Sequence, residues 1–419
     1  MRFQIVKGTR DILPEEIPRW RHIENTARRI LEAFGYREIR TPTFESTRLF
    51  ARSIGETTDI VEKEMYSFRD RKGREITLRP EGTAPIIRAY IEHGITPPMK
   101  LYYLGSMFRY ERPQKGRSRE FYQVGIEAIG SLSPMLDAEA IDCGQYLLKE
   151  MGLRQLEIRL NSIGCRRCRV AYKKDLVAYI EKKKSKLCEM CQRRISENPF
   201  RILDCKNSTC KRIASRAPVI VESLCEECME HFRSVRSHLE RLGIDYILDP
   251  HLFRGLDYYT KTTFEFVSNA LGAKDTILGG GRYDYLVGEL GGDETPAIGW
   301  ALGVDRLLLA LDEEGFRFPD THPKTVFVAW TSDRTKAKSV EIVRDLRRAG
   351  IPCEIDYEDR NLKSQLKLAN RLDVGFALIV GDEELKSEQV ILRDMGTGNQ
   401  EMVALTQLKN SLQARIRPC

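Results

Sequence analysis

The 419-residue sequence has no long hydrophobic run, no internal repeat and no low-complexity segment. No apolar stretch approaches the roughly 18 residues that a membrane-spanning helix needs. The first ten residues also lack the apolar core of a signal peptide. We therefore expect a cytoplasmic protein with no membrane association. The net charge is only +7, which permits a polyanionic partner without requiring one.

The sequence also lacks a dinucleotide-binding fingerprint. The glycine run Gly279–Gly281 does not follow the Gly-x-Gly-x-x-Gly spacing, and it does not open a βαβ unit. Such a run nevertheless lets the backbone approach a ligand closely. The overall composition, 42% hydrophobic and 31% charged, is typical of a globular protein. The length predicts two or three domains.

Cysteine, by contrast, is concentrated in one segment. Of the 11 cysteines, eight lie between residues 165 and 228. Six form Cys-x-x-Cys pairs and two are separated by four residues: Cys165 and Cys168, Cys188 and Cys191, Cys225 and Cys228, and then Cys205 and Cys210. In a reducing compartment such pairs indicate metal ligands, and four thiolates make a closed structural zinc site. Eight ligands predict one or two Zn²⁺ sites, and the spacing leaves open which pairs combine. Free cysteines and an iron–sulfur cluster are the alternatives.

The stretch Phe108–Glu127 has the pattern of a hairpin with a cationic loop. Polar and apolar residues alternate on both sides of the loop, which is typical of half-buried strands. The loop carries Arg112, Lys115, Arg117 and Arg119, and guanidinium groups suit phosphates. A solvated hairpin tip is the alternative.

Other polar residues lie close to the predicted ends of helices and strands. Glu81 and Thr83 stand at the start of a helix, where they could bind an amino group or simply cap the helix. Arg254–Tyr259 precedes a strand, and Pro296–Arg306 resembles a small-residue strand that runs into a helix. Further upstream, Tyr36–Glu45 indicates a strand broken by Pro42 at a sheet edge or an interface.

The last hundred residues form a different pattern. Strands and helices alternate after a linker at Asp312–Lys324, which predicts a separate α/β domain.

Taken together, these motifs resemble those of bacterial histidyl-tRNA synthetases, which are class II aminoacyl-tRNA synthetases. The resemblance covers essentially the whole chain. The matching segments are motif 1 at 35–45, motif 2 at 108–127, motif 3 at 297–306, and the two histidine signatures at 254–259 and 279–284. It implies an α+β catalytic core, an antiparallel sheet flanked by helices, at 1–322. An inserted Cys-rich helical domain at 162–245 would interrupt this core, and an anticodon-binding α/β domain would follow at 323–419.

The resemblance also implies site residues. Arg254 and Arg109 would be catalytic, and ATP, the substrate that enters with Mg²⁺, would meet Arg109, Glu111, Phe121 and Arg306. Histidine would be bound by Glu81, Gly82, Thr83, Gln123, Glu127, Arg254, Tyr258, Tyr259 and Tyr283. The tRNA acceptor end would meet Gln114, Lys115, Arg117 and Arg119.

The implied activity is ATP-dependent ligation of L-histidine to tRNA(His) by a homodimer. Two departures from the family pattern stand out. Lys261 replaces a frequent arginine, and Tyr285 replaces a usual small residue, which predicts a changed pocket lip. One rival is the synthetase-like regulatory subunit of ATP phosphoribosyltransferase, a histidine sensor. The other is a module that senses uncharged tRNA. We expect both to lack parts of the arginine loop or to carry altered domains.

Overall fold

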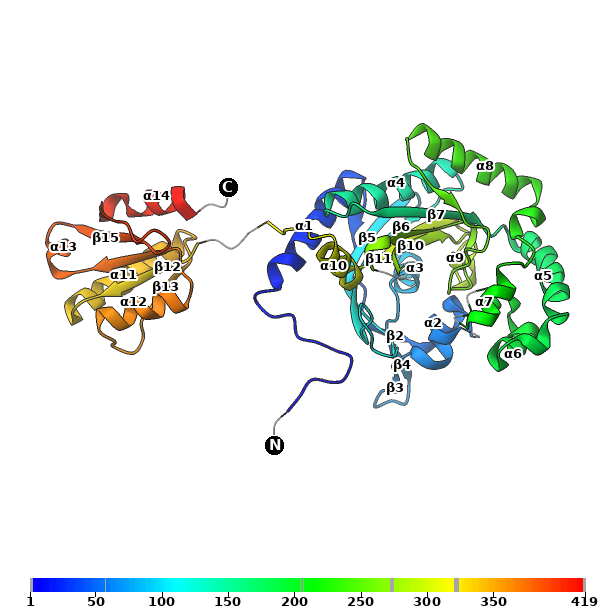
Figure 1. Ribbon diagram of the computed structural model, residues 1–419, viewed down its shortest axis with the longest axis horizontal. Coiled ribbons are helices and arrows are strands. Elements are labelled where there is room, and N and C mark those ends of the chain that lie inside the picture. The colour runs from blue at the N-terminus through cyan, green and yellow to red at the C-terminus, as the bar shows by residue number, and fades with distance from the viewer. Residues whose placement is uncertain are drawn as a thin grey trace. The chain divides into compact units, whose positions relative to one another are not determined.

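The computed structural model describes residues 3–56, 58–203, 205, 207–271, 275–319 and 324–416. The chain divides into two compact units (Figure 1), unit 1 at Met1–Phe318 and unit 2 at Pro319–Cys419. Among the described residues, no helix has both the length and the apolar character needed to cross a bilayer.

An eight-stranded sheet lies at the centre of unit 1, in the order β1-β5-β6-β11-β10-β9-β7-β8. The inner neighbours pair antiparallel, and only the outer pairs β1–β5 and β7–β8 are parallel. The strands are β1 (Arg37–Glu38), β5 (Met99–Phe108), β6 (Glu120–Ile129), β7 (Leu156–Ser162), β8 (Ile247–Leu248), β9 (Thr260–Ser268), β10 (Asp275–Arg282) and β11 (Ala297–Gly303). This arrangement confirms the predicted antiparallel core.

Three helices, α1 (Ile17–Ala33), α4 (Pro134–Glu150) and α8 (Glu226–Arg241), cover one face of this sheet (Figure 1). In α1 the apolar residues recur at helical spacing, so Ile23, Ala27 and Leu31 are fully buried against the sheet. Full burial of an isoleucine or leucine side chain such as these contributes about 1.5–3 kcal/mol. The helix ends where Gly35 takes a positive φ of 82°.

Shorter elements complete unit 1. A small sheet has the order β2-β4-β3. The elements are β2 (Phe44–Ser46), β3 (Ser67–Arg69), β4 (Glu75–Leu78), α2 (Thr47–Ile54), the π-helix η1 (Ile60–Glu64), α3 (Thr83–Glu92), α9 (Leu286–Glu289), α10 (Val304–Glu313) and the 3-10 helix η5 (Asn269–Leu271). The predicted strand break at Pro42 therefore separates β1 from β2, and the two strands enter different sheets.

A helical lobe is inserted between β7 and β8. It consists of α5 (Arg166–Glu181), η2 (Lys184–Lys186), α6 (Glu189–Glu197), η3 (Pro199–Ile202), α7 (Ser208–Ala214), η4 (Ile220–Ser223) and then α8. Figure 1 shows α5, α6 and α7 in green beside the sheet, and α8 returning over it next to α4. Tyr172, Leu176 and Ile202 are fully buried inside the lobe, so it has an apolar core.

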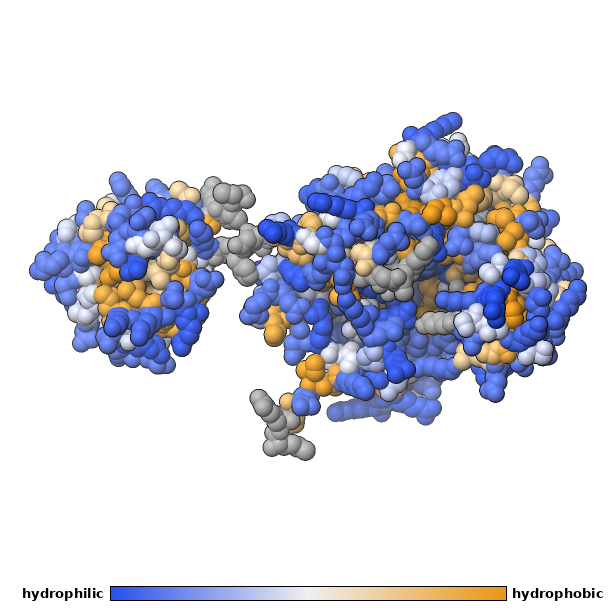
Figure 2. Space-filling model, in the orientation of Figure 1, coloured by the Kyte–Doolittle hydropathy of each residue, from blue (hydrophilic) through white to orange (hydrophobic). Residues whose placement is uncertain are grey.

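Unit 2 is built on a five-stranded mixed sheet in the order β13-β12-β14-β15-β16. Its elements are β12 (Val326–Trp330), α11 (Asp333–Arg348), β13 (Cys353–Ile355), α12 (Leu362–Arg371), β14 (Phe376–Val380), α13 (Asp382–Lys386), β15 (Gln389–Asp394), β16 (Gln400–Ala404) and α14 (Leu405–Ile416). In the space-filling view (Figure 2), hydrophilic residues cover most of its periphery. The α/β prediction for this region is confirmed. The predicted linker is shorter than expected because α10 continues to Glu313, and residues 320–323 lie outside the described residues.

Candidate active site

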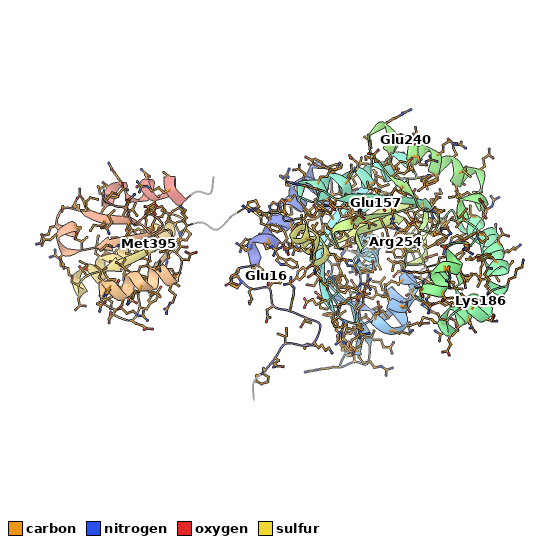
Figure 3. All side chains as sticks on the ribbon, in the orientation of Figure 1. Glu16, Glu157, Lys186, Glu240, Arg254 and Met395 are labelled. Atoms are coloured by element: carbon orange, nitrogen blue, oxygen red, sulfur yellow. The ribbon has the colours of Figure 1, made fainter. Side chains whose placement is uncertain are left out.

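A cavity of about 330 Å³ opens in unit 1 between the large sheet, the β5–β6 connection and the segment after β8. Twelve of the residues predicted to bind a ligand line it: Glu81, Thr83, Arg109, Glu111, Arg117, Phe121, Gln123, Arg254, Tyr258, Tyr259, Tyr283 and Arg306. Figure 3 places Arg254 near the middle of unit 1, whereas Lys186 lies at the outer end of the inserted lobe. Segments that are distant in sequence thus meet around one space.

Five predicted residues do not line this cavity. Gly82 is the N-cap residue of α3 and lies against Tyr103. Glu127 lies behind the wall, where it contacts two residues that do line the cavity. Gln114 lies in the β5–β6 connection, where it forms an isolated bridge with Arg117, which does line the cavity.

The other two residues of that connection have protein partners of their own. The Lys115 ammonium lies 2.6 Å from the Glu313 carboxylate of α10. The Arg119 guanidinium lies 3.8 Å from the centre of the Tyr110 ring. The strand predicted at Phe108–Glu111 is wrong beyond its first residue, because β5 ends at Phe108 and Glu111 already belongs to the connection.

Glu127 lies directly behind two residues of the cavity wall, Thr83 and Tyr283. The Thr83 hydroxyl donates to its Oε1 at 2.6 Å, and the Tyr283 hydroxyl donates to its Oε2. The side chain is only 1% exposed. Burial raises the pKa of the Glu127 carboxyl to about 8, although both hydroxyl donors oppose this change and the nearby Glu81 adds to it. A carboxyl with such a pKa can either donate or accept a proton near neutral pH.

Glu81 satisfies the first turn of α3. Its two carboxylate oxygens accept hydrogen bonds from the backbone N–H groups of Thr83 at 2.7 Å and Ala84 at 2.9 Å. The capping role that the sequence left open is therefore present for Glu81. Burial raises its pKa, and Arg109 partly opposes that change. Because the same carboxylate lines the cavity, capping and ligand contact are compatible.

Three guanidinium groups also line the cavity, those of Arg109, Arg254 and Arg306. Arg109 donates from Nε to the Pro80 carbonyl at 2.8 Å, and Arg306 donates from Nη1 to the Thr276 carbonyl at 2.8 Å. Arg254 forms an ion pair with Glu265. Each arginine is thus fixed by protein acceptors, which is the arrangement that stabilises charge developing on a phosphate.

Two glycines make room for these groups. The run Gly279–Gly281 lies inside β10 rather than in a loop, which the sequence did not indicate. A Cβ on Gly279 would lie 2.4 Å from both Nη atoms of Arg254. A Cβ on Gly299 in β11 would lie 2.0 Å from Oε2 of Glu127. The predicted close approach is real, but the approaching groups include the protein's own side chains.

The sequence prediction missed Tyr103, Glu265 and Thr276, which also line the cavity. Glu265 could have been found, because it is a lone charge within the apolar strand Thr262–Val267. Tyr103 could not, since its place depends on Gly125, the residue opposite it in β6.

The eight predicted thiols form two separate clusters, Cys165 with Cys168, Cys225 and Cys228, and Cys188 with Cys191, Cys205 and Cys210. Within each cluster all Sγ atoms lie within 4.8 Å of one another, and all eight cysteines are free. The Sγ atom of Cys165 lies 3.6 Å from that of Cys168 and 3.9 Å from that of Cys225, and the Sγ atoms of Cys188 and Cys205 are 3.9 Å apart. A tetrahedron with zinc–sulfur bonds of about 2.3 Å has edges of about 3.8 Å, so the spacing fits Zn²⁺.

Comparisons with known proteins agree with this geometry. The family model for histidyl-tRNA synthetase matches residues 8–307, and the model for an anticodon-binding domain matches residues 325–415. The chain belongs to the histidyl-tRNA synthetase family.

Individual relatives match over almost their whole length. The histidine–tRNA ligase of Halothermothrix orenii is 49% identical over 98% of this chain and 99% of the relative. That of Moorella thermoacetica is 50% identical over 95% of each. The crystal structure of apo S. aureus histidyl-tRNA synthetase has a TM-score of 0.83 and 39% identity, and covers 98% of this chain and 100% of that one. The predicted synthetase fold is confirmed.

Lys261 and Tyr285, which depart from the pattern expected for histidyl-tRNA synthetases, both contact the inserted lobe. The Lys261 ammonium lies 3.1 Å from Glu227 of α8 and 3.6 Å from Asp284. The Tyr285 ring lies under the Arg166 guanidinium at 4.2 Å. Tyr285 is not among the residues that line the cavity, so the expected change of the pocket lip is not seen.

Proposed function

We propose that this protein is a histidine–tRNA ligase. It would form histidyl-adenylate from L-histidine and ATP with release of pyrophosphate, and then transfer histidine to the 3′-terminal adenosine of tRNA(His). The observation that carries this proposal is the shared cavity, which is lined by Arg109, Arg254, Arg306 and Tyr283, with Glu127 hydrogen-bonded to Tyr283 directly behind its wall.

Histidine would occupy the end of the cavity near Glu127. Its imidazole would meet Glu127, Tyr259 and Tyr283, with Tyr258 beside them. Its ammonium group would approach the Glu81 carboxylate near Gly82 and Thr83, and Gln123 would face its backbone. A pocket built from hydrogen-bonding groups strongly rejects isosteres that cannot satisfy them, so no editing site is required.

ATP would occupy the end lined by arginines. Arg109 and Arg306 would contact its phosphates, Phe121 would stack on adenine, and Glu111 would bind the adenosine part. Glu111 and Glu265 line the cavity with carboxylate oxygens, the ligand type that Mg²⁺ prefers, and these residues would hold the ion that accompanies ATP.

In the first step the histidine carboxylate would attack the α-phosphorus of ATP. A P–O bond to the carboxylate forms, the bond to pyrophosphate breaks, and negative charge develops on the non-bridging oxygens. Arg254 would stabilise that charge and align the carboxylate without proton transfer, because arginine stays charged. The terminal ribose hydroxyl of the tRNA would then displace AMP from the acyl carbon.

The remaining assignments concern the tRNA and the assembly. We propose that Gln114, Lys115, Arg117 and Arg119 meet the acceptor end, and that the ion pair of Lys115 with Glu313 opens when tRNA arrives. We also propose the boundaries 1–322, 162–245 and 323–419 for the catalytic, inserted and anticodon-binding domains. A homodimer, a cytoplasmic location and one structural Zn²⁺ in each cysteine cluster complete the proposal.

Histidine-dependent exchange of pyrophosphate into ATP tests the first step directly. We expect exchange with histidine and none with the other amino acids, followed by charging of tRNA(His). A protein that binds histidine but supports neither reaction would favour the regulatory-subunit alternative. That alternative is the weaker one, because relatives at 49% and 50% identity are named histidine–tRNA ligase.

A further inference from the structure

The first cysteine cluster lies at the neck of the inserted lobe. Cys165 is the N-cap residue of α5, which begins the lobe, and Cys225 is the N-cap residue of α8, which ends it. Their sulfur atoms are 3.9 Å apart although 60 residues separate them in sequence. An ion held by these two residues together with Cys168 and Cys228 would join the two ends of the lobe.

Arg169 connects this neck to the candidate histidine pocket. It follows Cys168 directly in α5, and its Nη1 donates to two backbone carbonyls, those of Asp257 and Tyr259, each at 3.2 Å. Both carbonyls belong to Arg254–Tyr259, the segment that supplies five residues to the cavity wall. The first turn of α5 therefore holds this segment from outside.

The lobe grips the same segment at a second point. Arg201 of η3 donates from Nη2 to Oδ1 of Asp257 at 2.8 Å, and the Asn198 amide lies 3.3 Å from both carboxylate oxygens. Arg201 is only 8% exposed, whereas the Asp257 side chain is 30% exposed, so the ion pair is partly shielded from solvent. Asp257 is consequently held through its side chain by η3 and through its carbonyl by α5.

Backbone hydrogen bonds also join the neck of the lobe to the start of β9. The N–H of Ile163 donates to the Lys261 carbonyl at 2.8 Å, and the N–H of Lys261 donates to the Gly164 carbonyl at 2.9 Å. Gly164 also lies directly against Cys168, since a Cβ at this glycine would be 2.5 Å from the Cβ of that cysteine. A change in the geometry of the cysteine cluster would therefore reach Asp257, Tyr259 and Lys261, in the C-terminal half of the Arg254–Lys261 stretch.

We propose that a Zn²⁺ ion bound by Cys165, Cys168, Cys225 and Cys228 positions the histidine-binding segment by fixing the first turn of α5 and thus Arg169. This inference rests on the proposed function, because the role of Arg254–Tyr259 in binding histidine is itself part of that proposal. Arg169 is a positioning residue, since it acts on the ligand only through the segment that it holds.

The metal part is tested by counting ions on the full chain. We expect Cys168→Ser to carry one zinc ion fewer per chain than the wild type, measured by mass spectrometry of the purified protein. The control Cys353→Ser, which changes a buried cysteine of unit 2, should keep the wild-type content. Substitution with Co²⁺ should give thiolate charge-transfer absorption that weakens in Cys168→Ser alone. Equal metal content in Cys168→Ser and the wild type, or no metal in either, would overturn the assignment.

The positioning part is tested by kinetics. In pyrophosphate exchange, Arg169→Met should raise the KM for histidine by about tenfold, since a charged hydrogen-bond donor to the segment is lost. The KM for ATP should stay unchanged. Arg167→Met is the matched control, because Arg167 lies on the same turn of α5 and is exposed. Arg169→Lys, which keeps the charge, should give an intermediate value.

The same measurements distinguish a failure of the coupling between the cysteine cluster and the histidine-binding segment from a failure of the proposed function. Cys168→Ser should raise the KM for histidine in the same direction as Arg169→Met, with thermal unfolding confirming that the variants are folded. Histidine kinetics equal to those of the wild type in either variant would refute the coupling. If the wild type showed no histidine-dependent exchange, the proposed function would fail, whereas the metal count would still report on the ion.

Discussion

Replacement of Glu127 by glutamine removes one titrating group from directly behind the wall of the cavity. The glutamine has the same size, and its amide can still accept from Thr83 and donate to the oxygen of Tyr283. Since the side chain is 1% exposed, solvent cannot stabilise the ionised form of its carboxyl group. The substitution therefore isolates the consequence of burying an acid at this position.

The magnitude follows from the difference between the ordinary pKa of 4.5 and the value of about 8 in the folded protein. A group whose pKa is raised by folding favours the folded state fully below pH 4.5, and this contribution is lost as the pH rises toward 8. At about 1.4 kcal/mol per pH unit, the wild type should lose roughly 3–4 kcal/mol of stability between pH 5 and pH 8 through this one group. The glutamine variant should not lose it.

Urea denaturation of both proteins at pH 5, 6, 7 and 8 measures this difference. We expect the unfolding free energy of the variant relative to the wild type to rise steadily with pH, whatever its value at pH 5. Control titrations without histidine are essential, because a bound ligand would stabilise the folded state by itself. A relative stability that is flat between pH 5 and pH 8 would show that Glu127 is ionised throughout, and would refute the reasoning.

Three further predictions concern the same unit. Histidine affinity, measured by calorimetry, should be greatest between about pH 6.5 and pH 8, where the imidazole and Glu127 together hold one proton, and should fall on both sides; a monotonic profile would contradict this. Arg254→Ala should lower adenylation about 10²–10³-fold with folding preserved, and a pyrophosphate-exchange rate near that of the wild type would remove Arg254 from the mechanism. Asp137→Asn should cost about 3–5 kcal/mol because Arg282 is fully buried against Asp137. As a control, the exposed Lys338–Glu341 pair of α11 in unit 2 should tolerate Glu341→Gln within about 1 kcal/mol, and equal losses in the two variants would contradict the role of burial.

The sequence predicted the elements around the site better than it predicted their contacts. The strand expected at Glu120–Ile129 is β6, although its last six residues are all buried instead of alternating, and the small-residue strand Ala297–Gly303 runs into a helix that carries Arg306, as expected. These features depend on local periodicity, which a single sequence contains. The strand predicted to continue to Glu111 ends at Phe108 instead, because strand ends depend on which partner is available for pairing.

Contacts between distant segments could not be predicted from pattern alone. The glycine run at 279–281 indicated close approach, but only the packed sheet shows that Arg254 takes part of that space. Likewise, three Cys-x-x-Cys pairs were evident, yet the partition into two clusters depends on α8 returning to the start of α5. Lys115 and Arg119 were expected to be open to a nucleic acid, whereas Glu313 and Tyr110 hold them in this structure.

The double use of Glu81 has a consequence for any attempt to alter which amino acid is accepted. Glu81 lines the cavity, and its two carboxylate oxygens hold the first N–H groups of α3, so the proposed ligand contact and the scaffold depend on one residue. Re-engineering of this corner would therefore change thermal tolerance together with selectivity. A library varied at Glu81 and screened at one elevated temperature would discard altered specificities merely because their helix had lost its first turn.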